Sequence, residues 1–378
     1  MRHEYTDHIL SHFTIVFPRS RSHRHVCSIV ERRIFNTHEF TMSAAIDANS
    51  SANQSCNVYI YTETAQVLFP IFYILVFLFS VSGNSLILYV TWRKQQKFKS
   101  TSLYLVNLAA SDALFTLALP GRIAYYVRGF DWPFGDFTCR LTAMVFYANT
   151  YAGIAFMTCI SLDRYLAMVH PHRLLYLRRP RAVRGVCVLV WVVVLLENAP
   201  LLLRTTLVET AGKRACMEYF SLGESASLPY LILAACAVGY GLPLVVILGC
   251  YTQIRRKLSR KARQNPASSR SPHSHRANSI ILIILLAFVL CFSPYHLNVA
   301  QFMARGLRRR PSCDEMKAFK MSLQVTVSLM NLNCCLDPVI YFFAIKTYKK
   351  RVMSLFRGFQ LGSGQSSSPT TDRSSSNT

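Results

Sequence analysis

The stretch "FMTCISLDRYLAMVHP", residues 156–171, ends an apolar run with an acid, a base and a tyrosine in succession: Asp163, Arg164 and Tyr165. Charged side chains are costly in hydrocarbon and ordinary in water, so their meaning depends on what surrounds them. The apolar run begins near residue 141 and is long enough for a helix to cross a bilayer of about 30 Å. The acid and the base are therefore predicted to stand at a membrane face.

The composition extends this prediction to the whole chain. The 378 residues are 52% hydrophobic and only 16% charged, whereas soluble proteins carry about 25% charged residues. Apolar stretches of similar length recur at roughly 67–90, 103–126, 141–168, 183–203, 228–251, 280–302 and 319–343. Backbone polar groups in lipid must be satisfied internally, so each stretch is predicted to be helical. The sequence thus predicts an all-α membrane protein, a bundle of seven transmembrane helices.

Basic residues predict the orientation. The connections after spans one, three, five and seven contain Lys and Arg and no acid as far as Arg357, whereas the other connections mix both signs. Positive charge concentrates on the cytoplasmic side. We therefore expect a multi-pass plasma-membrane protein with an extracellular N-terminus. Because the bases flank the spans, anionic membrane lipids account for the net charge of +24, and no nucleic-acid partner is expected.

The remaining segments differ in composition. The predicted organisation is an extracellular tail over 1–65, a seven-helix domain over 66–345, a short amphipathic membrane-surface helix over 346–359 and a disordered Ser/Thr-rich cytoplasmic tail over 360–378. Residues 1–41 are rich in His and Arg. They are either an upstream extension of the reading frame ahead of Met42 or a genuine basic tail.

Five cysteines fall outside the spans, in a compartment that is oxidising and favours pairing. They are Cys27, Cys56, Cys139, Cys216 and Cys313. One pairing that fits is Cys139–Cys216, which leaves Cys56–Cys313 as a second bridge and Cys27 unpaired. Asn49 and Asn53 are glycosylation acceptors in the same outer segment.

Polar residues inside the spans are functional candidates because they are expensive there. The residues Asp112, Asn149, Asn333 and Asp337 fall at similar depths. Their carboxylate and amide oxygens suit a sodium ion, and hydrogen bonding between helices is the alternative. No His/Cys spacing in the spans suggests a metal centre, and no cofactor other than an allosteric sodium ion is expected.

Each of the seven spans contains a short motif, and together these motifs resemble those of a known family. They are "GN" at 83–84, "NLAASD" at 107–112, "DRY" at 163–165, Trp191, Pro243, "CFSP" at 291–294 and "DPVIY" at 337–341. In this order, over residues 66–356, the chain resembles rhodopsin-like (class A) G-protein-coupled receptors. The resemblance implies a heterotrimeric G protein as partner, with arrestin binding a phosphorylated Ser/Thr tail. It also implies that Asp163 holds Arg164 at rest, and that Arg164 is freed on activation to meet the G protein, with Tyr251 and Tyr341 as its new partners.

The outer halves of the spans indicate the ligand. Phe146 stands where amine receptors place an aspartate, and Asn331 where opsins place the retinal lysine. The outer halves instead offer an arginine and phenols among apolar residues, which suits an amphipathic ligand. These candidate ligand-binding residues are Arg122, Tyr147, Tyr151 and Tyr295.

Local sequences are similar to the oxysterol receptors of lymphocytes within the same family, among them "CRLTAMVFYANTYAGIAFMTC" at 139–159 and "LMNLNCCLDPVIYFFA" at 329–344. This resemblance implies dihydroxylated sterols such as 7α,25-dihydroxycholesterol as ligands. It also implies an inhibitory-class G protein and a role in immune-cell migration.

Three alternatives stay open. The first is a receptor of the same family for an anionic ligand, such as a nucleotide, lysophospholipid or peptide, drawn by Arg305, Arg308, Arg309 and Arg310. A channel or transporter is less favoured because the outer half of the bundle is apolar and no internal repeat is visible. An enzyme is least favoured, since the spans contain no nucleophile–base pair.

Overall fold

The computed structural model describes residues 63–93, 100–171, 175–203, 207–210, 212–217, 227–264 and 272–363. Contacts divide the chain into two units, Met1–Asn57 and Val58–Thr378, and every described residue belongs to the second. The predictions for Asn49, Asn53, Cys27, Cys56 and residues 1–41 fall outside the described residues.

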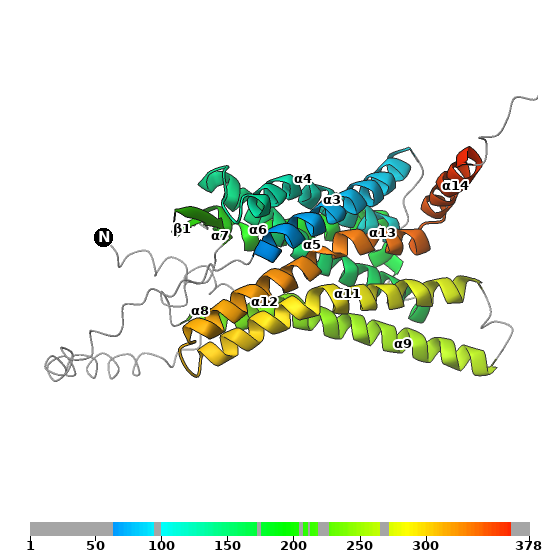
Figure 1. Ribbon diagram of the computed structural model, residues 1–378. Helices are drawn as coiled ribbons and strands as arrows, with labels where there is room; N and C mark the ends of the chain where they lie inside the picture. The colour runs from blue at the N-terminus through cyan, green and yellow to red at the C-terminus, as the bar shows by residue number, and fades with distance from the viewer. Residues whose placement is uncertain are drawn as a thin grey trace, which may run out of the picture. The chain divides into compact units, whose positions relative to one another are not determined.

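The described residues form a helical bundle with one small hairpin (Figure 1). The helices are α3 (Glu63–Trp92), α4 (Ser100–Val127), α5 (Asp136–Val169), α6 (Pro180–Asn198), α7 (Pro200–Leu203), α8 (Leu228–Cys236), α9 (Leu242–Gln264), α11 (Pro272–Gly306), α12 (Cys313–Asn331), α13 (Asn333–Ala344) and α14 (Lys346–Ser363), with a 3₁₀ turn, η1 (Leu175–Arg178), before α6. Within the described part of the chain, seven helical stretches are long and apolar enough to span a membrane. The predicted seven-helix fold is confirmed.

Two of the seven spans are interrupted near prolines. The fifth span consists of α8, a π-helical turn (η2, Ala237–Gly241) and α9, whose second residue is Pro243. The seventh consists of α12 and α13, which meet at Leu332. A π turn inserts an extra residue into the helix and rotates the residues after it, a device found often at functional sites. These interruptions lie where the inner and outer halves of the bundle meet.

A close helix crossing sets the position of the seventh span. Gly83 of α3 lies against Pro338 of α13, and a Cβ added at Gly83 would stand 2.3 Å from the proline Cγ. Small residues at such crossings let membrane helices pack closely. The crossing fixes Asp337, the neighbour of Pro338, in the bundle interior, where its side chain is fully buried.

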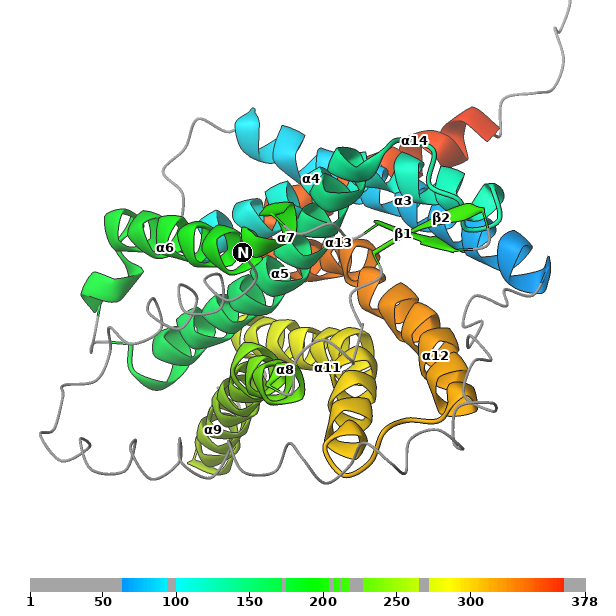
Figure 2. The ribbon, with the colours of Figure 1, turned by 90° about the vertical axis from the view of Figure 1, so that its left-hand side faces the viewer.

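A hairpin covers the outer end of the bundle. Strands β1 (Leu207–Thr210) and β2 (Lys213–Cys216) pair antiparallel, with Leu207 opposite Cys216. Figure 2 looks onto this end and shows the hairpin beside the helix ends. Trp132, buried after α4, is linked to β2 because its backbone N–H donates to the Arg214 carbonyl at 2.9 Å. The hairpin is thereby attached to the connection between α4 and α5.

After the seventh span, α14 takes the place of the predicted amphipathic helix. It begins at Lys346, as expected, and continues to Ser363, beyond the expected boundary at 359. Near its start Tyr348 is buried and packs edge-on against Tyr341 of α13, with ring centroids 6.0 Å apart. This contact joins α14 to the inner end of the seventh span.

Candidate functional site

A cavity of about 40 Å³ lies under the hairpin. Its lining comes from α4, α5, α12 and the residue after β2, and consists of Arg122, Phe146, Tyr147, Met217, Leu323, Gln324, Val327 and Met330. The lining is apolar apart from the guanidinium, one phenol and one amide. Such a cavity matches the usual composition of a small-molecule site, in which a few polar groups orient an apolar ligand.

Arg122 is the charged group of this cavity and is only 3% exposed. Its guanidinium lies over three rings, with 5.3 Å to the centroid of Tyr125, 5.0 Å to Tyr126 and 5.5 Å to Phe146. Its Nη1 also donates to the Met217 sulfur at 2.9 Å. Aromatic faces and a thioether are weak partners for a buried cation. These contacts hold the guanidinium at the wall of the cavity.

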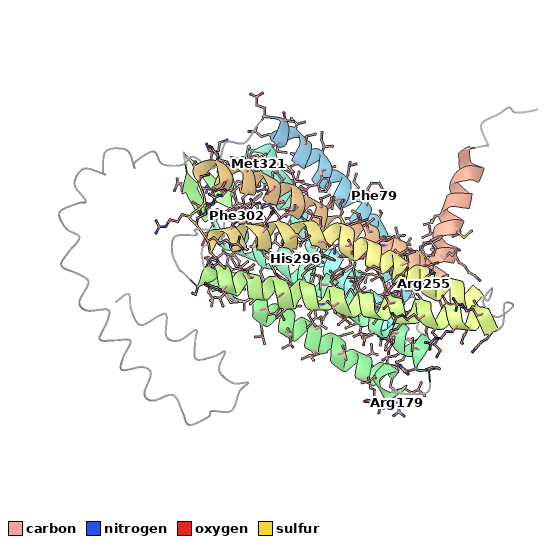
Figure 3. All side chains as sticks on the ribbon, turned by 90° about the horizontal axis from the view of Figure 1, so that it is seen from below. Phe79, Arg179, Arg255, His296, Phe302 and Met321 are labelled. Carbon is pink, nitrogen blue, oxygen red and sulfur yellow. A yellow bond between two sulfur atoms is a disulfide. The ribbon has the colours of Figure 1, made fainter. Side chains whose placement is uncertain are left out.

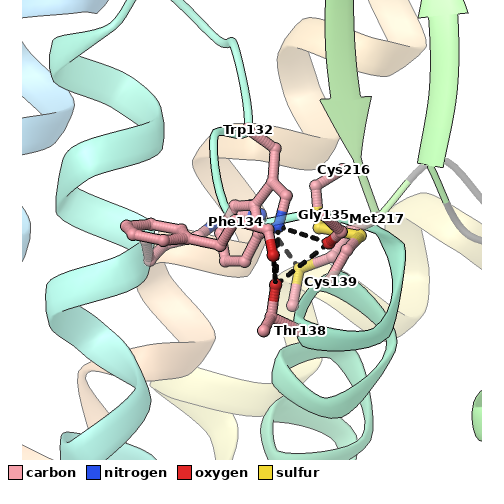
Figure 4. Close-up of a disulfide and its surroundings, with 8 residues drawn as sticks. Trp132, Phe134, Gly135, Thr138, Cys139, Cys216 and Met217 are labelled. Atoms are coloured by element: carbon pink, nitrogen blue, oxygen red, sulfur yellow. Dashed lines mark hydrogen bonds between the residues drawn. A yellow bond between two sulfur atoms is a disulfide. The ribbon is translucent and has the colours of Figure 1, made fainter.

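The cystine beside the cavity explains how Met217 reaches Arg122. Cys139 at the start of α5 is bonded to Cys216 of β2, as predicted (Figure 4). Met217 follows directly, with a positive φ of 67° that turns its side chain back toward the bundle. Trp132 packs nearby, and its indole N–H donates to the Gly135 carbonyl at 3.0 Å. Cys313 is also in a disulfide, and its expected partner Cys56 lies outside the described residues.

The three predicted tyrosines gather deeper, around His296. The hydroxyls of Tyr147 and Tyr295 are hydrogen-bonded to each other. Tyr151 packs edge-on against the His296 ring at a centroid distance of 6.4 Å. Of the three, only Tyr147 lines the cavity. Tyr295 is connected to the cavity through its bond to Tyr147, and Tyr151 is not part of the lining. The structure thus brings Arg122 and Tyr147 together and places the other two in a supporting layer.

Sequence reasoning missed Tyr240, which the π turn presents to this layer. Its ring stacks on His296 at 4.5 Å, and its hydroxyl donates to Ser293 at 2.6 Å. His296 in turn is 1% exposed and uses Nδ1 against the Phe292 carbonyl at 2.8 Å. A helical projection without the extra residue would have turned Tyr240 elsewhere. Met217 and Gln324 were also missed, because nothing in their local sequence marks them.

A polar cluster lies in the inner half of the bundle. Tyr341 donates to Asn84 at 3.2 Å and to Asp112 at 3.4 Å. Turning the Asn149 amide about its last bond lets its nitrogen donate to Asp112 at 3.2 Å. Asp112 and Asp337 are neighbouring, fully buried carboxylates, and apart from Asp112 no described residue donates a hydrogen bond to Asp337.

This arrangement suits a cation or a shared proton. Two adjacent carboxylates cannot both remain charged in an apolar interior without one of these. The Asn333 amide nitrogen also lacks a partner in the described part of the chain. Oxygen atoms from two carboxylates and two amides are ligands that a hard cation prefers. Three of the four residues singled out from the sequence, Asp112, Asn149 and Asp337, therefore lie together, and Asn333 precedes Asp337 by one turn of α13.

At the end of the bundle that the sequence predicts to be cytoplasmic, Asp163 has partners that the sequence did not indicate. Its carboxylate accepts from Ser100 at 2.6 Å, from Thr101, and from Nε of Arg178 at 2.9 Å. The side chain is 3% exposed. Arg178 ends η1, so the connection after α5 folds back onto the aspartate. The family resemblance implied that this carboxylate holds Arg164, and the bonds described for it come from α4 and η1.

The other residues of the expected switch are distributed over two places. The Tyr165 hydroxyl meets His170 at 3.1 Å and Gln253 of α9 at 3.3 Å. Tyr251 is half-buried on α9. Tyr341 lies in the polar cluster through its bonds to Asn84 and Asp112.

The comparisons with known proteins agree with this geometry. The family model described as 7 transmembrane receptor (rhodopsin family) matches residues 83–341. The chain therefore belongs to the rhodopsin family of seven-transmembrane receptors, whose partners are a ligand and a G protein, and it is a multi-pass plasma-membrane protein.

Particular relatives are more specific. The chain is 47% identical over 304 residues to the G-protein coupled receptor 183 of Homo sapiens, covering 80% of this chain and 84% of that one. It is 44% identical over 318 residues to the G-protein coupled receptor 183-A of Danio rerio, covering 84% and 86%. It is also 35% identical over 300 residues to the uracil nucleotide/cysteinyl leukotriene receptor of Homo sapiens, covering 79% of each chain.

Proposed function

We propose that this receptor binds dihydroxylated oxysterols of the 7α,25-dihydroxycholesterol type and signals through an inhibitory-class G protein, guiding immune-cell migration. The observation that carries the ligand class is Arg122, a buried cation at the wall of an otherwise apolar cavity. A sterol offers a large apolar body with a few hydroxyls. The cavity of about 40 Å³ is smaller than a sterol, so its apolar walls would move apart to take the body, and Arg122 would take a hydroxyl.

The energetics favour this use of Arg122. A guanidinium in an apolar site loses its hydration, and aromatic faces return only part of that loss. A hydrogen bond from a charged group to a sterol hydroxyl contributes about 1.5–3 kcal/mol. Tyr147 and Tyr295, which are bonded to each other, would together orient a second hydroxyl. Tyr151 and His296 would support these two from behind.

Signal transfer would use the inner face. The four basic inner connections favour an outer N-terminus, so Asp163 and Arg164 would face the cytoplasm, the G protein and, through the tail, arrestin. Asp163 is held by α4 and η1, and Arg164 would be released when the inner ends of the helices separate. The cluster of Asp112, Asn149, Asn333 and Asp337 would bind sodium in the resting conformation and release it on activation.

The test replaces the arginine and removes the hydroxyl in parallel. Arg122→Ala should weaken the potency of 7α,25-dihydroxycholesterol by roughly ten- to a hundredfold, because 1.4 kcal/mol is about tenfold. Arg128→Ala is the matched control: Arg128 directly follows the same helix, forms an exposed ion pair with Asp131 at 3.8 Å and should leave potency unchanged. Receptor abundance at the cell surface is measured for every variant.

Sterols lacking one hydroxyl each complete the test. The sterol whose missing hydroxyl meets Arg122 should be weak on the wild type and lose little more on Arg122→Ala, since both changes remove one contact. Tyr295→Phe should cost less than Arg122→Ala, because one neutral hydrogen bond is lost and the ring still packs. Full additivity for every hydroxyl would show that Arg122 does not contact the sterol.

A second candidate, an anionic ligand, is favoured by one relative and by Arg122 itself. The name of the 35% identical receptor includes uracil nucleotide and cysteinyl leukotriene, both acidic molecules. A phosphate or carboxylate would also bind a buried guanidinium strongly. Ligand charge separates the two: an anionic agonist should lose most of its potency when its acidic group is replaced by a neutral one, whereas a sterol is active without any charge.

A further inference from the structure

A second cavity, of about 250 Å³, opens between the outer ends of α11 and α12. It shares no lining residue with the cavity at Arg122. Its walls are two helical faces with matching spacing: Asn298, Gln301, Phe302 and Arg305 on α11, and Glu315, Ala318, Phe319 and Ser322 on α12. We call this cavity the α11–α12 groove. Figure 3 shows the two helices side by side, with Phe302 near this end.

The floor of the groove is aromatic and its rim is polar. Phe302 and Phe319 stack almost parallel, with centroids 3.7 Å apart and planes inclined by 4°. Above them, Ser322 donates to Asn298 at 3.1 Å. Arg309 binds both oxygens of Glu315, at 2.5 and 3.0 Å, and Glu315 also caps the start of α12. These contacts hold both walls in a fixed shape.

Among the charged residues that line the groove, Arg305 is not neutralised by these contacts. Glu315 neutralises Arg309, so Arg305 gives the groove its net positive charge. Its side chain is exposed, lines the cavity and has no ion pair or hydrogen bond within the described residues. A planar guanidinium in such a position matches a phosphate group, to which it can donate two parallel hydrogen bonds.

The surface next to the groove is apolar and exposed, as expected of a surface that contacts lipid. Leu297 is 62% exposed and lies one turn from Gln301, while Met321 and Val325, 37% and 50% exposed, continue the face of Ala318 on α12. Figure 3 places Met321 on this surface, at the end of the bundle where Phe302 also lies. A ligand that fills the groove would therefore meet a phosphate-binding cation first and lipid-facing side chains next. This order matches the head group and acyl chains of a phospholipid.

We propose that the α11–α12 groove binds an outer-leaflet phospholipid, with its phosphate on Arg305 and its acyl chains along Leu297, Met321 and Val325. The site is separate from the sterol cavity. The two walls of the groove belong to the sixth and seventh spans. The lipid therefore binds best at one distance between α11 and α12 and stabilises the conformation that has this distance. Arg305 then has a membrane ligand rather than a soluble agonist.

The experiment uses the full chain, purified in detergent and stripped of lipid. Short-chain phosphatidylcholine is titrated, and bound lipid is measured by native mass spectrometry alongside the melting temperature. Arg305→Gln should raise the apparent Kd about tenfold or more, the effect of losing one charge-assisted hydrogen bond. Arg308→Gln, an exposed neighbour outside the lining, should bind as the wild type does.

Two further arms separate the sources of binding. Ala318→Trp keeps every charge but fills the groove, and should abolish lipid binding. Arg122→Ala should leave it unchanged, so that failure of the sterol proposal does not affect this one. The assignment would be overturned if Arg305→Gln or Ala318→Trp bound the lipid as the wild type does. It would also be overturned if diacylglycerol with the same chains bound equally well, or if inorganic phosphate raised the melting temperature equally.

Discussion

Replacing Gly83 by alanine tests the close crossing of α3 and α13. An added Cβ would stand 2.3 Å from Pro338 Cγ and 2.8 Å from Pro338 Cβ. Because carbon atoms pack at about 3.5–4.0 Å, α3 and α13 would have to separate by about 1.2 Å. Overpacking of this kind costs about 1–3 kcal/mol. Alanine also stabilises a helix interior by about 0.5–1 kcal/mol relative to glycine, which offsets part of that cost.

The matched control removes the helix-propensity contribution. Gly185 lies within α6, and a Cβ there would meet nothing within 4 Å. Gly185→Ala should therefore raise the melting temperature slightly, while Gly83→Ala lowers it; both are measured on purified receptor in one detergent. The difference between the two should correspond to about 1–3 kcal/mol. Equal shifts in both variants would show that α3 and α13 are not in contact at Gly83.

Three further predictions concern the other sites. Cys139→Ser should cost about 2–5 kcal/mol and abolish surface expression or agonist binding; a variant that is expressed and binds normally would show that the bridge is dispensable. Asp163→Asn should raise ligand-free G-protein activation, and Arg178→Gln should do so to a lesser extent. Arg164→Ala should abolish coupling to the G protein but retain ligand binding. Full G-protein activation by the Arg164 variant would contradict the switch. Added sodium should lower agonist affinity, and Asp112→Asn should remove that effect; the same sodium dependence in the variant would leave only hydrogen bonding between helices.

The spans were predictable because the bilayer imposes their length. A helix that crosses hydrocarbon needs about 20 apolar residues whatever its neighbours are, so hydropathy alone locates it. The Cys139–Cys216 bridge was accessible for a related reason, since orientation limits which cysteines share the oxidising side. Residues such as Asp112 and Asp337 stood out because an acid in a span is rare. In each case the membrane supplies a constraint that acts on local sequence.

Contacts made by folded connections were not predictable in this way. Arg178 reaches Asp163 only because η1 turns back under α4, and Met217 reaches Arg122 only because the hairpin and its disulfide place it there. Both residues lie in polar connections, where their own sequence resembles any basic or mixed loop. The orientation of Tyr240 depends on one extra residue in a π turn, which shifts the register by less than hydropathy can resolve.

The two predicted sites of the inner half are coupled through Tyr341. Its hydroxyl now donates to Asn84 and Asp112, so the side chain must move away from both to reach a group near Arg164. If Tyr341 meets Arg164 on activation, Asp112 loses a donor in the same step. A cation that neutralises Asp112 binds the resting arrangement better, and its release must then accompany the movement of Tyr341. Tyr341→Phe should therefore weaken the sodium effect and the coupling to G protein together, whereas a change in only one of them would show that the cluster and the switch act independently.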